Sequence, residues 1–293
     1  MSRFLFFKPV LKEMIWGGKG LDKFGYKPKS DKIGEAWLIS AHENGESICI
    51  NGEWKKKSLA GMGLREIWET YPEIFGAKKN TGEKFPLLIK YIDAKDDLSI
   101  QVHPDDEYAF KHEDGAKGKT EFWYILDCEE NADIVIGHNA KSKDELKNMI
   151  DNGSWSELLN IIPIKKGDFF YIEAGTVHAI RKGTLLLEVQ QNSDITYRLY
   201  DYDRLQNGLP RKLHIEKSLD VIKVPANYKN TRKAVKILGA GEVEVLADEE
   251  FFKVEYVKIK GSECIDFDNY TFHIVNIIKG EASINDESVK IGD

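Results

Sequence analysis

The sequence predicts a mainly β protein whose strands pack into barrels and which carries a small helical insertion. Short runs rich in aromatic and β-branched residues recur along the chain, separated by Gly and Asn turns. Apolar residues follow helical spacing in only two stretches, residues 58–75 and 142–159. The side chains best suited to bind a ligand fall near the ends of predicted strands. These observations together favour a sheet scaffold with a site at one end.

The first half of the chain predicts strands with one helix between them. Residues 46–50 predict a strand that ends at an Asn51-Gly52 turn. Residues 58–75 predict a helix, because apolar residues recur there every three or four positions. Residues 85–100 have a strand-rich composition, and the aromatic, apolar run 121–126 predicts a further strand.

The second half of the chain adds a helical insertion and then a region in which only short strands are predicted. Ser142 and Glu145 form a capping-box signal, and the apolar pattern continues across Asn152-Gly153, so two short helices are expected. After a linker near residue 225 only short strands are expected, among them 251–259 and 272–278. We therefore expect one domain over residues 1–225, with the helical insertions, and a second β domain over residues 226–293.

The last five residues, Val289 to Asp293, repeat the pattern of Ile164 to Asp168. In the first copy the pentad leads directly into the strand-like stretch that reaches His178. The second domain is therefore expected to stop at the start of the corresponding strand pair. Such a pair takes about 20 residues. Either those residues are absent from this sequence, or the second barrel is left open.

Composition and charge exclude several classes of protein. The chain is 42% hydrophobic and 31% charged and has no apolar run long enough to span a membrane. Its net charge of −7 argues against nucleic acid as a partner. Three cysteines lie far apart without metal spacing (Cys49, Cys128 and Cys264), which indicates a reducing compartment, and the N-terminus lacks a signal-peptide pattern. A cytoplasmic protein is expected; the oligomeric state stays open.

Four donor side chains predict a metal site. Gln101 and His103 are two residues apart near a predicted strand end, so they should share one face. Glu121 opens a predicted strand, and His178 closes the stretch 167–178. If these strands lie side by side in a barrel, two imidazoles, a carboxylate and an amide oxygen meet. That set suits a divalent metal, with zinc the first choice and manganese and cobalt also compatible.

A single histidine in an apolar segment is more often structural than a ligand, so the spacings must carry the prediction. The stretch from Gly167 to His178 resembles the second cupin motif, although Glu173 stands where a proline is usual. The segment from Gln101 to Glu121 resembles the first cupin motif, although Gln101 replaces its first histidine. Two half-motifs in the right order favour a cupin.

Longer strings resemble one family, type I mannose-6-phosphate isomerase in its short form. They are Gly34-Glu35-Ala36-Trp37, Pro86-Leu87-Leu88-Ile89-Lys90, Ser99-Ile100-Gln101-Val102-His103-Pro104, Gly118-Lys119-Thr120-Glu121 and Gly175-Thr176-Val177-His178-Ala179. The resemblance covers essentially the whole chain. It implies cupin jelly-roll barrels, a catalytic cupin domain over residues 1–225 and a second cupin-like domain over residues 226–293. It also implies a zinc-dependent aldose–ketose isomerase acting on a sugar phosphate.

The resemblance also implies roles for single residues. Gln101, His103, Glu121 and His178 would hold one zinc ion per chain. Lys119, Arg198 and Glu188 would be catalytic, and Lys90, Lys119 and Arg198 would bind the substrate. Each has a simpler alternative: Lys90 could reach solvent from a strand end, Arg198 could pair with Asp201 or Asp203, and Glu188 could be a paired buried acid.

The reaction that the resemblance implies, interconversion of mannose 6-phosphate and fructose 6-phosphate, moves a proton between C1 and C2 through an enediol. That reaction needs a proton carrier, positive charge near the developing oxyanion and a phosphate anchor. A cupin oxygenase is a competing hypothesis, but an amide ligand is atypical of its iron site. A sugar-binding or metal-binding regulator is another, but the sequence has no helix-turn-helix pattern or basic stripe. The residues leave the proton-transfer base undecided.

Overall fold

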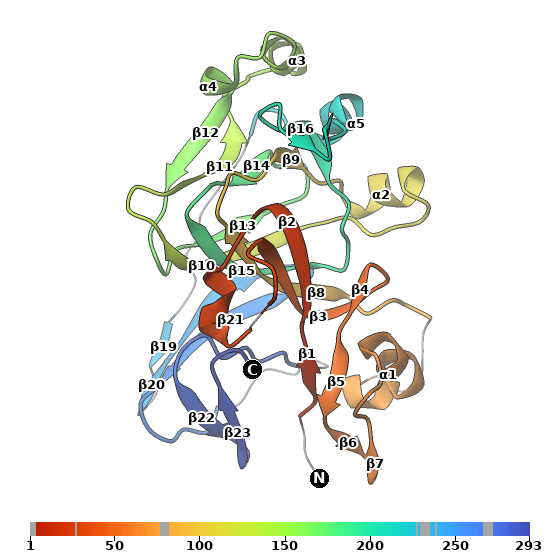
Figure 1. Ribbon diagram of the computed structural model, residues 1–293, viewed down its shortest axis with the longest axis vertical. Coiled ribbons are helices and arrows are strands. Elements are labelled where there is room, and N and C mark those ends of the chain that lie inside the picture. Colours follow the sequence, from red (N-terminus) through yellow and green to blue (C-terminus); the bar gives the residue numbers. More distant parts are fainter. Residues whose placement is uncertain are drawn as a thin grey trace.

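The mainly β architecture is confirmed: two antiparallel sheets form the centre of the computed structural model (Figure 1). The residues that the structure describes are 4–26, 28–76, 82–226, 228, 235–237, 239–265 and 272–293. One sheet has seven strands and the other has five. Apolar side chains of both sheets join in one buried cluster, for example Trp123 and Leu186 from the first sheet with Ile134 and Ile180 from the second. The two sheets therefore pack face to face as a jelly roll.

The seven-stranded sheet runs in the order β13-β10-β15-β8-β3-β2, with β4 paired to β3. Its strands are β2 (Val10–Gly18), β3 (Ile33–His42), β4 (Gly45–Glu46), β8 (Leu87–Ala94), β10 (Glu121–Cys128), β13 (Phe169–Ile172) and β15 (Thr184–Gln191). The five-stranded sheet runs in the order β12-β11-β14-β9-β16. Its strands are β9 (Ile100–Val102), β11 (Asp133–His138), β12 (Leu159–Pro163), β14 (His178–Ile180) and β16 (Tyr197–Tyr200).

Smaller elements surround these sheets (Figure 1). The strands are β1 (Phe6–Lys8), β5 (Ile48–Asn51), β6 (Glu53–Trp54), β7 (Lys57–Ser58), β17 (Leu205–Gln206), β18 (Leu209–Pro210), β19 (Val235–Ile237), β20 (Gly241–Asp248), β21 (Lys253–Ile259), β22 (Glu281–Ile284) and β23 (Glu287–Lys290). The helices are α1 (Leu64–Thr70), α2 (Asp106–His112), α3 (Lys143–Asp151), α4 (Trp155–Leu158) and α5 (Ile215–Val221), with short 3₁₀ turns η1 (Gly20–Phe24) and η2 (Pro72–Phe75).

The interior changes from apolar to polar along each strand. On β15, Leu186 belongs to the core between the sheets, and the next side chain on that face is Glu188. On β8 the same step leads from Ile92 to Lys90. On β10 the inner face carries Trp123 and then Glu121. One end of the barrel is thus a packed core, and the other collects buried charges.

Two further clusters cover the outer faces of the sheets. Phe122 and Tyr91 on the outside of the seven-stranded sheet pack with Leu246 and Phe252 of the C-terminal part. Val135 on the outside of the five-stranded sheet packs with α3 and α4. The helical insertion therefore lies on one side of the barrel, as expected, away from the polar interior.

The predicted helix over residues 58–75 is shorter than expected. Residues 57 and 58 form β7, and the helix begins only at Leu64. Gly61 has φ +93°, which a helix cannot accommodate. Pro72 lies at the start of the separate turn η2, because proline cannot continue a helix as a hydrogen-bond donor. The prediction of two short helices after Ser142 is confirmed by α3 and α4.

Three strand predictions need correction. The strand-rich stretch 85–100 is two strands in different sheets, β8 and β9. His178 opens β14 instead of closing the strand before it. Gly175 makes the turn between β13 and β14 with φ +85°. A Cβ at this position would clash with the Val221 carbonyl oxygen. Residues 272–278 form no assigned strand, although Ile277 exchanges two backbone hydrogen bonds with Gly292 and Asp293.

The repeated pentad makes the same turn twice. In the first copy Asp168 N donates to Lys165 O (3.0 Å) and Lys165 N donates to the Asp168 carboxylate (2.9 Å). Asp293 and Lys290 make the same two bonds at the same two distances. We propose on this basis that residues 226–293 are a second cupin-like unit, separate from a first unit over residues 1–225.

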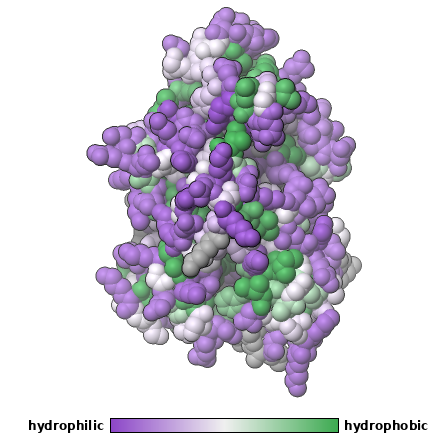
Figure 2. Space-filling view, in the orientation of Figure 1, coloured by the Kyte–Doolittle hydropathy of each residue, from purple (hydrophilic) through white to green (hydrophobic). Residues whose placement is uncertain are grey.

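The visible surface fits a protein that folds around internal cores. On the face drawn in Figure 2, hydrophilic side chains predominate and apolar ones lie in separate groups. Within the described residues, no helix has the length and apolar character needed to cross a bilayer.

Candidate active site

Strand register brings the predicted donors to one face. His178 on β14 is paired with Gln101 on β9, and Gln101 is paired with Arg198 on β16. Cross-strand partners share a face, so these three side chains point into the barrel together. His103 follows β9 by one residue, and Glu121 begins β10 on the opposite sheet. The two sheets therefore present their donors to each other.

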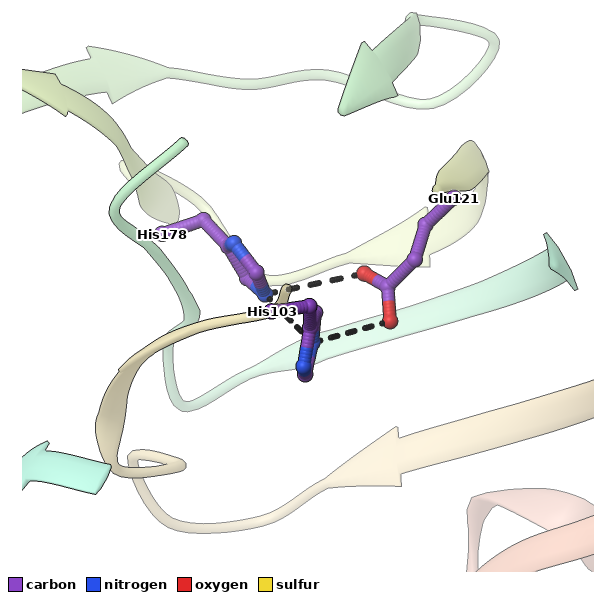
Figure 3. Close-up of side chains that lie close together, drawn as sticks. All are labelled: His103, Glu121 and His178. Atoms are coloured by element: carbon purple, nitrogen blue, oxygen red, sulfur yellow. Dashed lines mark hydrogen bonds and ion pairs between the residues drawn. The ribbon is translucent and has the colours of Figure 1, made fainter. Parts of the chain in front are cut away.

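His103, Glu121 and His178 meet at one point (Figure 3). The two Nε2 atoms are 3.1 Å apart, and His103 Nε2 is 3.2 Å from Glu121 Oε1. His178 Nε2 is 3.6 Å from Glu121 Oε2. All three side chains are at most 1% exposed. Their donor atoms all lie within 4.8 Å of one another, which is close enough to bind a single ion.

Backbone carbonyls orient both imidazoles. His103 Nδ1 donates to Ile195 O (2.7 Å), and His178 Nδ1 donates to Thr176 O (2.9 Å). Each Nε2 is then left with a lone pair that faces the other. Burial, with the nearby Lys119 charge, lowers the pKa of His103 to about 3, and burial also lowers the pKa of His178. Both rings are neutral, as metal ligands must be.

The charges of this cluster fit a bound cation. Neither carboxylate oxygen of Glu121 has a hydrogen-bond partner of good geometry, although Lys119 Nζ lies 2.5 Å from Oε1. Burial alone would raise the pKa of Glu121, but the Lys119 ammonium holds it well below its usual range. The Lys119 ammonium also lies 3.2 Å from His103 Nε2, so it offsets part of the repulsion among the two facing lone pairs and the ionised carboxylate. A divalent metal that prefers imidazole and carboxylate ligands satisfies all of them.

Gln101 lies beside this cluster. Its amide Nε2 is 3.3 Å from His178 Nε2, and its Oε1 lies 3.5 Å from Ser99 Oγ. Amide oxygen and nitrogen exchange places when the group rotates by 180°, and that rotation turns the oxygen toward the histidines. The position is compatible with a fourth ligand, which stays a prediction.

A row of buried residues crosses the seven-stranded sheet next to the metal cluster. Trp37 is paired with Lys90, Lys90 with Glu188, and Glu188 with Trp123. Lys90 Nζ is 3.0 Å from Glu188 Oε1, and the Trp123 indole donates to Glu188 Oε2 (2.9 Å). Lys90 is therefore buried and paired, and does not reach solvent. We call Glu35, Trp37, Lys90, Glu188 and Trp123 the buried row.

The electrostatics of the buried row favour a charged lysine. Burial alone would lower the pKa of Lys90, but the carboxylates of Glu188, Glu35 and Glu121 outweigh it and raise that pKa. Burial raises the pKa of the Glu188 carboxyl, Glu121 raises it further, and Lys90 opposes both. Glu188 is thus a carboxylate with increased proton affinity beside a fixed ammonium.

Arg198 borders the site from the five-stranded sheet. Its Nε donates to Ser99 Oγ (3.3 Å), and a terminal nitrogen donates to Lys212 O (2.9 Å). Asp201 forms no ion pair with Arg198, because its carboxylate binds two other arginines. Burial, with help from Arg211, lowers the pKa of Arg198. The contacts with Ser99 and Lys212 use two of its five N–H donors, so the guanidinium keeps donors available for a ligand.

Arg198 also lines a cleft of about 350 Å³. Across it lie residues of β2, among them Glu13 and Trp16. Arg211 and Lys212 add positive charge to the same cleft. An anion carried by a ligand would be attracted here.

Several of these residues escaped sequence reasoning. Glu35 and Trp37 lie in the string Gly34 to Trp37 that resembles the family, but the sequence did not indicate a role for them in the site. Arg211 and Lys212 lie beyond the motif around Arg198. A dense group of cations in the short segment after Arg198, including Arg204, was the available signal.

Comparison with known proteins identifies the family. The model of the phosphomannose isomerase type I catalytic domain matches residues 5–121. Mannose-6-phosphate isomerase ManA of Bacillus subtilis is 48% identical over 278 residues, which cover 94% of this chain and 86% of the relative. This chain belongs to the type I phosphomannose isomerase family.

Solved structures agree with that membership. The mannose 6-phosphate isomerase of Bacillus subtilis superimposes with a TM-score of 0.91 and 44% identity, covering 98% of this chain and 91% of that one. A mannose 6-phosphate isomerase solved with bound zinc and yttrium has a TM-score of 0.60 and 17% identity, covering 84% and 81%. At that identity the second likeness supports the fold alone, whereas the first extends to the whole chain.

Proposed function

We propose that this member of the type I phosphomannose isomerase family interconverts mannose 6-phosphate and fructose 6-phosphate at the His103–Glu121–His178 cluster. It is an aldose–ketose isomerase, because its relatives are mannose-6-phosphate isomerases. The observation that carries the proposal is one buried group of metal-type donors surrounded by the cations Lys90, Lys119 and Arg198. An isomerase needs that combination, because negative charge develops on a sugar oxygen in the enediol.

We further propose that one zinc ion per chain is held by Gln101, His103, Glu121 and His178. The set of nitrogen and oxygen donors supports this, as does the zinc bound by a solved isomerase of the same fold. A zinc ion supplies Lewis acidity next to the sugar oxygens. Manganese and cobalt are compatible with the same donors.

The surrounding side chains divide the remaining work. Lys119 and Arg198 contribute positive charge beside the developing oxyanion. Glu188, whose carboxyl pKa is raised by burial and by Glu121, carries the proton between C1 and C2. Three buried carboxylates (Glu35, Glu121 and Glu188) face two buried ammoniums (Lys90 and Lys119), which leaves a net charge of −1. A divalent ion converts this to +1, which suits an anionic intermediate.

The substrate phosphate is assigned to the cleft lined by Arg198. Lys212 is exposed there, and Arg211 adds a second guanidinium that is partly neutralised by Asp201. Because the Arg198 backbone pairs with Gln101, the cleft borders the metal cluster. A cytoplasmic location is also proposed, supported by three cysteines that form no disulfide.

The direct test is product formation from mannose 6-phosphate by the purified protein. We expect fructose 6-phosphate to appear, with a kcat in the range common for enzymes, about 1–10³ s⁻¹. Glucose 6-phosphate, which differs in configuration at the reacting C2, serves as the comparison substrate. Absence of turnover in protein with a full complement of zinc would reject the function.

A further inference from the structure

The buried row holds more charge than the proposed chemistry uses. Lys90 has two carboxylate neighbours: Glu188 Oε1 at 3.0 Å and Glu35 Oε2 at 3.6 Å from Nζ. The side chains are only 7%, 3% and 10% exposed for Lys90, Glu188 and Glu35. Glu188 touches the proposed reaction region, whereas Glu35 has no role yet. A buried, ionised side chain without a function would be a net cost to the fold.

Each carboxylate is itself fixed by an indole. Trp37 Nε1 donates to Glu35 Oε2 (2.6 Å), and Trp123 Nε1 donates to Glu188 Oε2 (2.9 Å). Lys90 thus lies between two carboxylates that cannot rotate freely. The Trp37 ring also faces the ammonium, with Nζ 5.8 Å from the ring centroid. The lysine is held from both sides by elements of the rigid sheet.

The Lys90 ammonium has more N–H donors than its carboxylate neighbours can use. A lysine ammonium has three N–H groups. Glu188 Oε1, at 3.0 Å, is close enough to take one of them, whereas Glu35 Oε2, at 3.6 Å, is an ion-pair partner beyond hydrogen-bond range. At least two are left over, and Lys90 lies on the inner face of β8, which looks onto the metal cluster. A free N–H of Lys90 is therefore available to a ligand.

We propose that Glu35 is a positioning residue of the isomerase: with Glu188 it fixes the Lys90 ammonium by ion pairing so that a free N–H reaches a sugar oxygen of the substrate. This inference rests on the proposed function. Glu35 lies on β3, separated from Glu121 on β10 by β8 and β15. It therefore acts through Lys90 and does not contact the reacting atoms.

Glu35→Gln is the decisive substitution, because it keeps the shape and removes the charge. We expect kcat to fall by about 10- to 100-fold, since a misplaced catalytic group costs about that much. KM should change less than about twofold, because the lost interaction grows only as charge develops. Zinc content and the unfolding midpoint are measured alongside and should stay near wild type. Loss of zinc would instead indicate a structural role and overturn the inference.

A double-mutant cycle separates action through Lys90 from any other effect. With Lys90→Met already in place, adding Glu35→Gln should change kcat less than about twofold. An undiminished loss in that background would show that Glu35 acts independently of Lys90. Trp37→Phe provides a second measurement that does not need the Lys90 variant to fold. It keeps the Glu35 charge but frees the carboxylate, so a smaller loss in kcat, about 3- to 10-fold, is expected.

Glu46→Gln is the matched control, because Glu46 pairs with Arg65 of α1 and is not part of the buried row. Its kcat should equal that of the wild type. An active wild type with an unchanged Glu35→Gln variant would reject the positioning role alone. A wild type without isomerase activity would overturn the proposed function and this role with it.

Discussion

The site depends at the residue scale on which nitrogen of each histidine carries its proton. The Ile195 and Thr176 carbonyls accept from Nδ1, so both Nε2 atoms are free to face the same ion. Sequence spacing could suggest His103 and His178 as ligands, because their neighbours form recognisable strings. It could not supply the tautomer of His103, because Ile195 lies far along the chain and meets that ring only in the fold.

His178→Ala should lose metal and activity together. Even partners that only orient a ligand affect metal affinity about 10- to 100-fold, so removing the ligand itself should cost at least about 100-fold. Metal content after dialysis and initial isomerisation rate are the two readouts. A variant that retained zinc with wild-type affinity would contradict the ligand assignment.

Arg198→Ala should keep the metal and lose turnover. Removing a group that stabilises developing charge costs about 10²- to 10³-fold in kcat. Arg65→Ala, an exposed arginine on α1, is the control and should retain wild-type turnover. Near-normal turnover of Arg198→Ala would show that the arginine assignment is wrong.

The charged residues differ in how far sequence could predict them. Lys119 and Glu121 are two apart, so one string suggests both. Lys90 and Glu188 are almost a hundred positions apart and become partners only through the register of β8 and β15. Glu35 became visible as a site residue only when its 3.6 Å approach to Lys90 was known.

At the scale of single elements, alternation along the strands organises the molecule. The strand-rich composition of residues 85–100 and the aromatic run 121–126 made the fold class predictable, whereas the step from apolar to charged on the inner faces of β8, β10 and β15 appeared only in the structure. Element ends were less predictable. The helix expected over residues 58–75 loses its first turn to Gly61, whose positive φ breaks the hydrogen-bond ladder that the apolar pattern suggested.

Ser142→Ala should weaken α3 without affecting catalysis. Ser142 Oγ accepts from Glu145 N (3.1 Å), so removing it costs about 1 kcal/mol of unfolding free energy. Because α3 packs on the outer face of the five-stranded sheet, kcat should not change. Urea unfolding measures the loss of unfolding free energy, and the isomerase assay measures kcat. Ser156→Ala, inside α4, is the control. A fall in kcat would mean that the insertion communicates with the site.

The whole molecule is a barrel whose seven-stranded sheet is covered on its outer side by the C-terminal part. Tyr26 donates to Gly292 O (2.9 Å), and Tyr124 stacks on Tyr256 at 5.7 Å. The change near residue 225 to short predicted strands without helices suggested a second unit. The repeated pentad suggested that this unit has the same fold as the first. The face on which it packs could not be predicted, because both outer faces of a sandwich carry apolar residues.

Three partly buried tyrosines predict a loss of stability at alkaline pH. Burial raises the pKa of Tyr26, Tyr124 and Tyr171 to about 12 each. In the unfolded chain they titrate near pH 10, so above that pH the unfolded state binds fewer protons and is favoured. Stability is complete below about pH 10 and falls between about pH 10 and 12, by at most about 1.4 kcal/mol per pH unit for each tyrosine. Urea unfolding across that window measures it, and Tyr26→Phe should reduce the slope. A slope unchanged in that variant would contradict the assignment.

The central claim is that isomerisation takes place at the His103–Glu121–His178 cluster with one bound metal ion. The most direct test is to strip the protein with a chelator, add zinc back in steps and follow conversion of mannose 6-phosphate to fructose 6-phosphate. We predict no conversion without metal and a rate that rises linearly to a plateau at one zinc per chain. Full conversion by the metal-free protein, or a plateau at a different stoichiometry, would contradict the claim.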